Sequence, residues 1–276
     1  MSQLKVLIVD DSAVIGPSLT EILKRGIYYV YALVFKAMLL LTAIDACSQS
    51  TINTGRPSVS ENAGIVSAGS LQFENGLAFI SRKNLKSLMI PDVLARTGIT
   101  NRLEARIGAT YYGEKDMLND SPYQHTFKDV TTGIKYNFTK VNGWIPEFSA
   151  IVKYGMMTEN KDFLLTFDHV LGKRFSVTNN VVVSWVNNSL ASYAYIFFLN
   201  YKVNDKTTVF IENFNYYYSN ATNEHAFHAG VVYLLAPLVQ LDCTAATYPF
   251  SRDSYFIQTG LSFRIDFKKP LTVSPN

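Results

Sequence analysis

From Ile65 onward, apolar and polar residues alternate along the chain with a period of two. The stretch 102–112 shows this most plainly, because Leu103, Ala105 and Ile107 are separated by charged residues. An alternation of this kind predicts β-strands whose two faces meet different surroundings. The pattern continues to Phe267, so strands are expected over nearly all of this part of the chain.

The alternation divides residues 65–267 into twelve predicted strands, each close to the roughly 9–11 residues that a tilted strand needs to cross a bilayer. An even number of such strands, separated by turn-forming residues, predicts an all-β fold, an antiparallel transmembrane β-barrel. The predicted strands are 66–80, 88–98, 102–112, 127–138, 147–157, 163–173, 178–187, 192–203, 206–218, 225–235, 238–248 and 255–267.

The predicted connections differ between the two ends of this barrel. One set is short, except for the longer connection 139–145. The opposite set is generally longer and more polar. Short turns at one end and longer loops at the other are typical of outer-membrane barrels, in which the short turns and both ends of the barrel face the periplasm. The other short turns are 100–101, 173–177, 204–205 and 236–237, and the long loops are 113–126, 158–162, 188–191, 219–224 and 249–254.

A soluble β-barrel, with its apolar face inside, would show the same alternation. Two features favour the membrane. Tyr and Phe gather near the ends of the predicted strands, as at 216–218, which is typical of the aromatic belts at membrane interfaces. Glycines recur on the polar face, at Gly108, Gly133 and Gly260, which suits a crowded lumen. We therefore expect the apolar face to contact lipid and lipopolysaccharide in the bacterial outer membrane.

The last predicted strand carries a further signal. Gly260, Phe263, Ile265 and Phe267 are spaced as in the assembly signal on the final strand of outer-membrane proteins. The tail 268–276 departs from that pattern, because such proteins usually end at the final aromatic residue. These positions predict the barrel-assembly machinery as a partner.

The composition agrees with many two-faced strands. Aromatic residues make up 13% of the chain and charged residues only 17%, below the roughly 25% of soluble domains. The net charge of +3 is small and the basic residues are scattered, so we expect no nucleic-acid partner. Only Cys243 lies within the predicted barrel, and its isolation predicts neither a disulfide framework nor a metal site. No cofactor is expected.

The first residues have a different character. The stretch KVLIVDDSAVIGPSLTEIL, from Lys5 to Leu23, resembles the first strand, acidic turn and first helix of response-regulator receiver domains, those of chemotaxis methylesterases in particular. No phosphoacceptor aspartate or later strand–helix units follow. We therefore interpret residues 1–25 as a truncated receiver-like leader that is not functional in a phosphorelay.

Residues 26–48 are largely apolar after Lys24 and Arg25, and Ala46 and Ser48 form a possible cleavage site. This order predicts a secretory signal segment. A single membrane anchor and a soluble helix are the alternatives. Residues 49–64 are polar and rich in Ser, Asn and Gly, and predict a flexible periplasmic linker before the barrel.

Four stretches of the predicted barrel carry a family resemblance: GITNRLEARIGATYY, VTTGIKYNF, WIPEFSAIVKYG and VNDKTTVFIENF. Together with the closing strand, they resemble a transporter-like outer-membrane family of Bacteroidetes-type bacteria that is labelled for the MetA pathway of phenol degradation. The resemblance extends over residues 54–267 and includes no catalytic motif. It implies a β-barrel and suggests the passage of small organic molecules, aromatic ones among them.

The polar face of the predicted barrel supplies the candidate site residues. A near balance of acidic and basic groups is more typical of ion pairs that fill a narrow barrel than of an ion pore, which shows a ring of one sign. The alternative is a solute path, in which the basic residues Arg102, Arg106, Lys135 and Lys153 contact an anionic or phenolic solute. The luminal candidates are Arg102, Glu104, Arg106, Asp129, Lys135, Glu147, Lys153 and Arg264.

Three functions follow from these features. We expect a channel for small organic solutes, with a closed structural barrel as the alternative and an outer-membrane lipid hydrolase as the third hypothesis. His225 and His228 are three residues apart, so a strand places them on opposite faces, where they do not converge on one nucleophile or metal. His125 falls in a predicted loop and His169 on the lipid-facing side, so no enzyme activity is expected.

Overall fold

The computed structural model describes residues 51–267, apart from positions 83, 119–121, 220 and 248–253. The predicted receiver-like leader 1–25, signal segment 26–48 and tail 268–276 lie outside the described residues. The fold described below lies within the compact unit Ser50–Asn276. Within the described residues, no helix is long and apolar enough to span a membrane.

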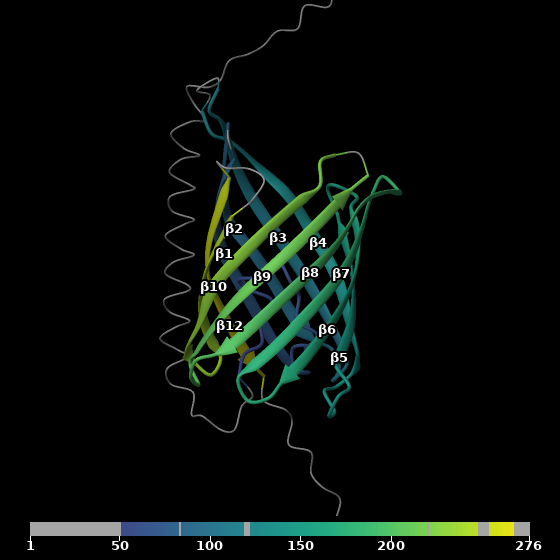
Figure 1. Ribbon diagram of the computed structural model, residues 1–276. Helices are drawn as coiled ribbons and strands as arrows, with labels where there is room; N and C mark the ends of the chain where they lie inside the picture. Colours follow the sequence, from purple (N-terminus) through teal and green to yellow (C-terminus); the bar gives the residue numbers. More distant parts are fainter. Residues whose placement is uncertain (1–50, 83, 119–121, 220, 248–253, 268–276) are drawn as a thin grey trace, which may run out of the picture. The chain divides into compact units, whose positions relative to one another are not determined.

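Twelve antiparallel strands form one closed barrel, in which each strand pairs with its neighbours in sequence and β1 pairs with β12 (Figure 1). Because the barrel is closed, no strand edge is left unpaired. The interior of a membrane requires this pairing, since it offers no water to the backbone groups. The predicted all-β fold and number of strands are confirmed. The strands are β1 (Ser70–Arg82), β2 (Leu85–Gly98), β3 (Leu103–Asp116), β4 (Gln124–Thr139), β5 (Glu147–Gly155), β6 (Lys161–Leu171), β7 (Phe175–Val186), β8 (Ser189–Lys202), β9 (Thr207–Tyr218), β10 (Glu224–Ala236), β11 (Val239–Thr247) and β12 (Tyr255–Asp266).

We call the end of the barrel where β1 begins and β12 ends the terminal end, and the opposite end the distal end. The predicted contrast in loop length between these ends is weaker than expected. At the distal end, only Asn187 and Asn188 connect β7 to β8, and both have positive φ angles of 50° and 62°. Two successive left-handed residues form a tight hairpin turn whose twist matches the strands. The predicted long loop at 188–191 is therefore wrong.

The outer surface of the barrel is apolar. Ile107, Ile134 and Val152, on three successive strands, are each more than half exposed. Near the terminal end, the rings of Phe138, Phe148 and Phe167 stack across β4, β5 and β6 with centroid distances of 5.0 and 4.7 Å. The stacked rings lie where an aromatic belt meets the membrane interface. The inward face carries the buried charges, so the predicted orientation of the two faces is confirmed for these strands.

The later strands differ from the prediction of a polar inward face. On β8, the inward side chains Ala194, Ile196 and Phe198 are apolar and buried, while the outward Tyr193 and Tyr195 are aromatic. Both faces of this strand are apolar, so the alternation alone does not assign its inner side. A buried apolar cluster lines this part of the lumen and consists of Ile151, Leu164, Val182, Ala194, Ile196, Phe214 and Ala226.

Candidate functional site

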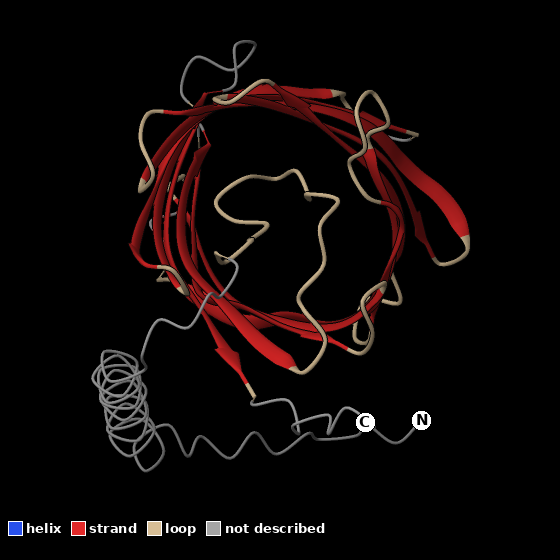
Figure 2. Ribbon diagram, turned by 90° about the horizontal axis from the view of Figure 1, so that it is seen from below, coloured by secondary structure: helices blue, strands red, loops and turns tan. Residues whose placement is uncertain are grey.

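Residues 51–69, which precede β1, lie inside the barrel (Figure 2). We call residues 51–69 the luminal segment. At the terminal end, the Ile52 N–H donates to the Pro237 carbonyl oxygen at 2.8 Å, and Ala68 forms a β-bridge with Gly98 before β1 begins. A flexible linker outside the barrel, as predicted for 49–64, is therefore wrong for the described part of this range. The lumen wall supplies the contacts that order it.

Wall side chains accept hydrogen bonds from the backbone of the luminal segment. A chain without regular structure cannot satisfy its own N–H and C=O groups, and buried backbone groups need partners. Asn180 meets both needs at one residue: its Oδ1 accepts from Glu61 N at 2.7 Å and its Nδ2 donates to Glu61 O at 2.8 Å. The other acceptors for segment N–H groups are Glu74 for Gly55, Glu212 for Val59 and Ser60, Asp168 for Ala63 and Glu104 for Val66.

Carbonyl groups of the segment are bonded in the same way. The buried Lys135 ammonium on β4 donates to Asn62 O at 2.5 Å and to Gly64 O at 2.6 Å. Asn137 donates to Ala63 O at 3.1 Å, and Ser149 donates to the same oxygen. The cation Lys135 therefore faces backbone carbonyls at close range, where a solute in the lumen would have to compete with them.

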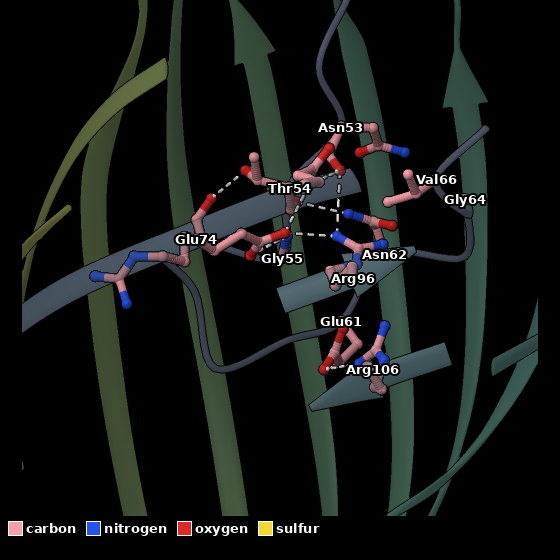
Figure 3. A network of polar contacts seen from close by, with 12 residues as sticks. Asn53, Thr54, Gly55, Glu61, Asn62, Gly64, Val66, Glu74, Arg96 and Arg106 are labelled. Atoms are coloured by element: carbon pink, nitrogen blue, oxygen red, sulfur yellow. Dashed lines mark hydrogen bonds and ion pairs between the residues drawn. The ribbon is translucent and has the colours of Figure 1, made fainter. Parts of the chain in front are cut away.

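A continuous row of ion pairs, which we call the charge ladder, joins the wall to the segment. Figure 3 shows two of its pairs, Arg96 with Glu74 and Arg106 with Glu61. Arg96 pairs with Glu74 at 2.6 Å and with Glu104 at 2.9 Å. Arg106 pairs with Glu104 at 2.7 Å and with Glu61 of the segment, also at 2.7 Å. These side chains are almost wholly buried, and buried charges are tolerated only when they are paired.

Glu61 is the last acidic group of the ladder and belongs to the segment, which does not itself cross the membrane. Its Oε1 also pairs with Lys153 on β5 at 3.0 Å. Burial favours the neutral form of Glu61, but Arg106, Lys153 and Lys135 outweigh burial and hold the pKa of Glu61 well below its usual value. Glu61 therefore remains ionised at neutral pH and ties the segment to β3 and β5.

Arg56 fixes the segment at a second place. Its guanidinium lies over Gly76 of β1 and Gly260 of β12, which pair across the strands that close the barrel. Asp92 and Asp242 flank the two glycines in the same row, with their oxygens 3.4 and 3.7 Å from the guanidinium nitrogens. A Cβ atom at either glycine would overlap the guanidinium. We call this row the arginine notch.

The predicted candidates are divided between several places. Glu104, Arg106, Lys135 and Lys153 contact the segment directly. Arg264 donates to Thr51 O at 3.4 Å and pairs with Asp266. Glu147 accepts hydrogen bonds from Asn137 and Lys140. Asp129 accepts from the Met157 N–H and from Thr158 near the distal end. Arg102 is exposed in the turn before β3 and does not join the luminal group.

Several residues of the site were not among the predicted candidates. Arg56 and Glu61 were placed in a linker, although they are the only charged residues of the polar stretch 51–64. Two single opposite charges in an otherwise uncharged stretch could have indicated that each has a specific ion-pair partner. The others are Glu74, Asn180 and Gly76.

Among the described residues, the segment lines two cavities, and a third adjoins the second of them. The terminal cavity, of about 460 Å³, has an excess of cations and also holds carboxylates and aromatic rings. Its lining includes Arg56, Lys173, Arg174, Lys202, Glu147, Asp168, Phe175 and Phe198. A middle cavity of about 260 Å³ lies between the segment and β2–β5. A distal cavity of about 220 Å³ carries the opposite sign, because Asp129 and Asp162 line it with Lys153.

The histidines of β10 lie on opposite faces of the strand, as the spacing predicts. His228 is buried in the lumen, with Nδ1 at 2.9 Å from Glu212 and its ring 5.5 Å from that of Phe256. His225 contacts Asn215 at 2.7 Å. In the part of the chain that the structure describes, no group of three His, Cys, Asp or Glu residues is arranged to hold a metal ion.

A closed antiparallel barrel with an apolar exterior and a polar, charge-paired interior defines the class of outer-membrane β-barrels, and the bacterial outer membrane is its location. The sequence matches the family described as "Putative MetA-pathway of phenol degradation" over residues 54–265, and the chain belongs to that family. No curated protein matches the sequence.

Solved structures share the fold at low identity. An outer-membrane channel from Pseudomonas putida F1 is 10% identical, with a TM-score of 0.64 over 76% of this chain and 100% of that chain. The NanC porin is also 10% identical, with a TM-score of 0.53 over 70% of this chain and 100% of that chain. At this identity the similarity concerns the fold alone.

Proposed function

We propose that this protein is a channel through which small organic solutes cross the outer membrane, and that the luminal segment controls its opening. The observation that carries the proposal is the sharing of lining residues between successive cavities. The terminal and middle cavities share Arg56, Ser58 and Ser60. All three belong to the segment, so displacement of the segment would join these two cavities.

The second junction lies on the wall. The middle and distal cavities share Thr110, Thr131 and Lys153, on β3, β4 and β5. Lys153 is held in place by Glu61 of the segment at 3.0 Å. Displacement of the segment therefore releases the one long side chain at this junction as well, and both junctions widen together.

The charges of the cavities bear on the solute. Lys173 and Arg174 favour anions in the terminal cavity, whereas Asp129 and Asp162 favour cations in the distal cavity. A path that is selective for one ion would carry one sign throughout. Organic solutes without net charge meet no repulsion at either end, and Phe175 and Phe198 offer aromatic surface to them. The family description and this lining together support phenols and similar small molecules.

The alternative is a closed structural barrel without transport. The charge ladder supports it, because buried and fully paired charges fill the lumen between β1 and β5. As further proposals, the outward apolar surface contacts lipid and lipopolysaccharide, and Gly260, Phe263, Ile265 and Phe267 are recognised by the barrel-assembly machinery during insertion.

Planar-bilayer recordings of the refolded protein distinguish the channel from the closed barrel. We expect discrete ohmic steps in the wild-type protein, and a several-fold higher open probability in Glu61→Gln, because Arg106 and Lys153 lose their charged partner on the segment. Glu224→Gln, which removes a carboxylate paired with Arg82 away from the three cavities, is the matched control and leaves the currents unchanged.

Liposome swelling with the neutral but membrane-impermeant phenyl glucoside, and with benzyl-ammonium and benzoate salts, then tests the solute class, with each rate corrected for that of protein-free liposomes. Faster entry of the neutral solute supports the proposal. A folded, heat-modifiable barrel that stays silent in both the wild-type and the Glu61→Gln protein would contradict the channel and favour the structural alternative.

A further inference from the structure

We infer that the lumen wall is a peptide-binding site, and that the luminal segment is its resident ligand. The site is defined by the contacts that hold the segment, and it exists whether or not the barrel conducts. It therefore goes beyond the proposed passage of small solutes.

The wall recognises the main chain of the segment. Apart from the bridge at Ala68, the segment forms no strand pairing with the barrel, and side chains take the place of a neighbouring strand. Asn180 binds both the N–H and the C=O of Glu61, as a paired residue in a sheet would. Glu212 accepts from two successive N–H groups, Val59 at 3.1 Å and Ser60 at 2.7 Å. Contacts of this kind do not depend on which side chains the peptide carries.

Two side chains supply the selectivity. Arg56 occupies the arginine notch, where Gly76 and Gly260 leave room for the flat guanidinium. Glu61 occupies a cationic position, 2.7 Å from Arg106 and 3.0 Å from Lys153. The ligand class is therefore a short looped peptide with an arginine five residues before a carboxylate, and with small residues between them.

A free peptide competes with the resident segment for this site. The segment is joined directly to β1, and a short tether gives an effective concentration on the order of millimolar. A micromolar free peptide is therefore excluded from the wild-type barrel. It binds when the resident segment is weakened.

The test uses the full chain with Arg56→Ala and Glu61→Ala together, folded in detergent and checked by heat modifiability. The probe is a fluorescent peptide with the wild-type sequence of residues 51–66, followed by fluorescence anisotropy. We expect saturable binding to the double variant, with affinity about tenfold higher than for the wild-type protein. A peptide carrying the same two substitutions, and a scrambled peptide, bind about tenfold more weakly.

A second variant covers the case in which the double variant does not fold. Gly76→Ala places a Cβ in the arginine notch and weakens the resident segment through Arg56 alone. This barrel should prefer the peptide with Arg56→Ala over the wild-type peptide, which reverses the order seen with an intact notch. A merely unfolded or leaky barrel does not produce such a reversal.

Equal binding of the wild-type, substituted and scrambled peptides, or no binding to either variant, would overturn the peptide site. These outcomes are separate from those for the channel. Peptide binding to a silent barrel refutes only the channel, whereas a conducting barrel that binds no peptide refutes only the peptide site.

Discussion

The two sides of the lumen are filled in different ways. Between β1 and β5, the charge ladder and Lys135 hold the wall to a segment that is not part of the barrel. From β5 to β10, the buried apolar cluster fills the interior with side chains of the strands themselves. Water can replace the segment beside charged groups, but it cannot favourably replace the partners of buried apolar side chains.

This difference indicates where the lumen can open. The middle cavity is lined by the ladder residues Glu61 and Glu74, and the distal cavity by Lys153, which pairs with Glu61. None of the three cavities is lined by a member of the apolar cluster. We therefore assign the movable part of the interior to the luminal segment and the permanent filling to the apolar cluster of β5 to β10.

Removal of a wall charge from the ladder should have the largest effect on stability. Arg96→Ala leaves Glu74 and Glu104 buried without their cation, and breaking a buried ion pair costs about 3–5 kcal/mol. We expect a loss of that size in the free energy of unfolding, measured by urea titration in detergent or lipid. Arg102→Ala, at an exposed turn, is the control and should change the free energy by less than about 0.5 kcal/mol. Equal effects of both substitutions would contradict the buried ladder.

A substitution in the apolar cluster should lower the free energy of unfolding but leave the conductance of the barrel unchanged. Phe214→Ala removes a buried ring that contacts Tyr216 and His228, and a deletion of this kind costs about 3 kcal/mol. Because this filling is permanent, the open probability in planar bilayers should stay at the wild-type value. A rise in open probability equal to that of Glu61→Gln would show that the two sides do not differ in the proposed way.

Acidification should weaken the docking of the segment, with a smaller effect than the two substitutions above. The pKa of Glu61 is lowered in the docked segment, so docking is fully stabilised above the usual glutamate pKa of about 4.3 and weakens as the pH falls below it. We expect the open probability to rise as the pH falls below about 4. In Glu61→Gln the rise should be absent. A rise that persists in this variant would assign the acid response to another group.

Much of the barrel follows from the sequence. All twelve strands were predicted with bounds within a few residues, because alternation reports directly on two different surroundings. The inward direction of Glu104, Arg106 and Lys135 followed from the same pattern.

The rest of the interior carries no periodic signal. The luminal segment has no repeating conformation, so its place in the lumen depends on partners from many strands. The inner face of β8 was missed because Ile196 and its outward neighbour Tyr195 are both apolar in character, and a strand that is apolar on both sides shows no alternation. The arginine notch was missed because glycine at positions 76 and 260 signals only the absence of a side chain, not what occupies the space.

The arginine notch also sets an order of events during folding. Gly76 lies on the first strand and Gly260 on the last, and they meet only when β1 pairs with β12. Until that pairing is complete, Arg56 has no complete place to bind. The luminal segment precedes every strand in the chain and so is made first, yet the docking of its Arg56 in the notch is completed only when the barrel has closed.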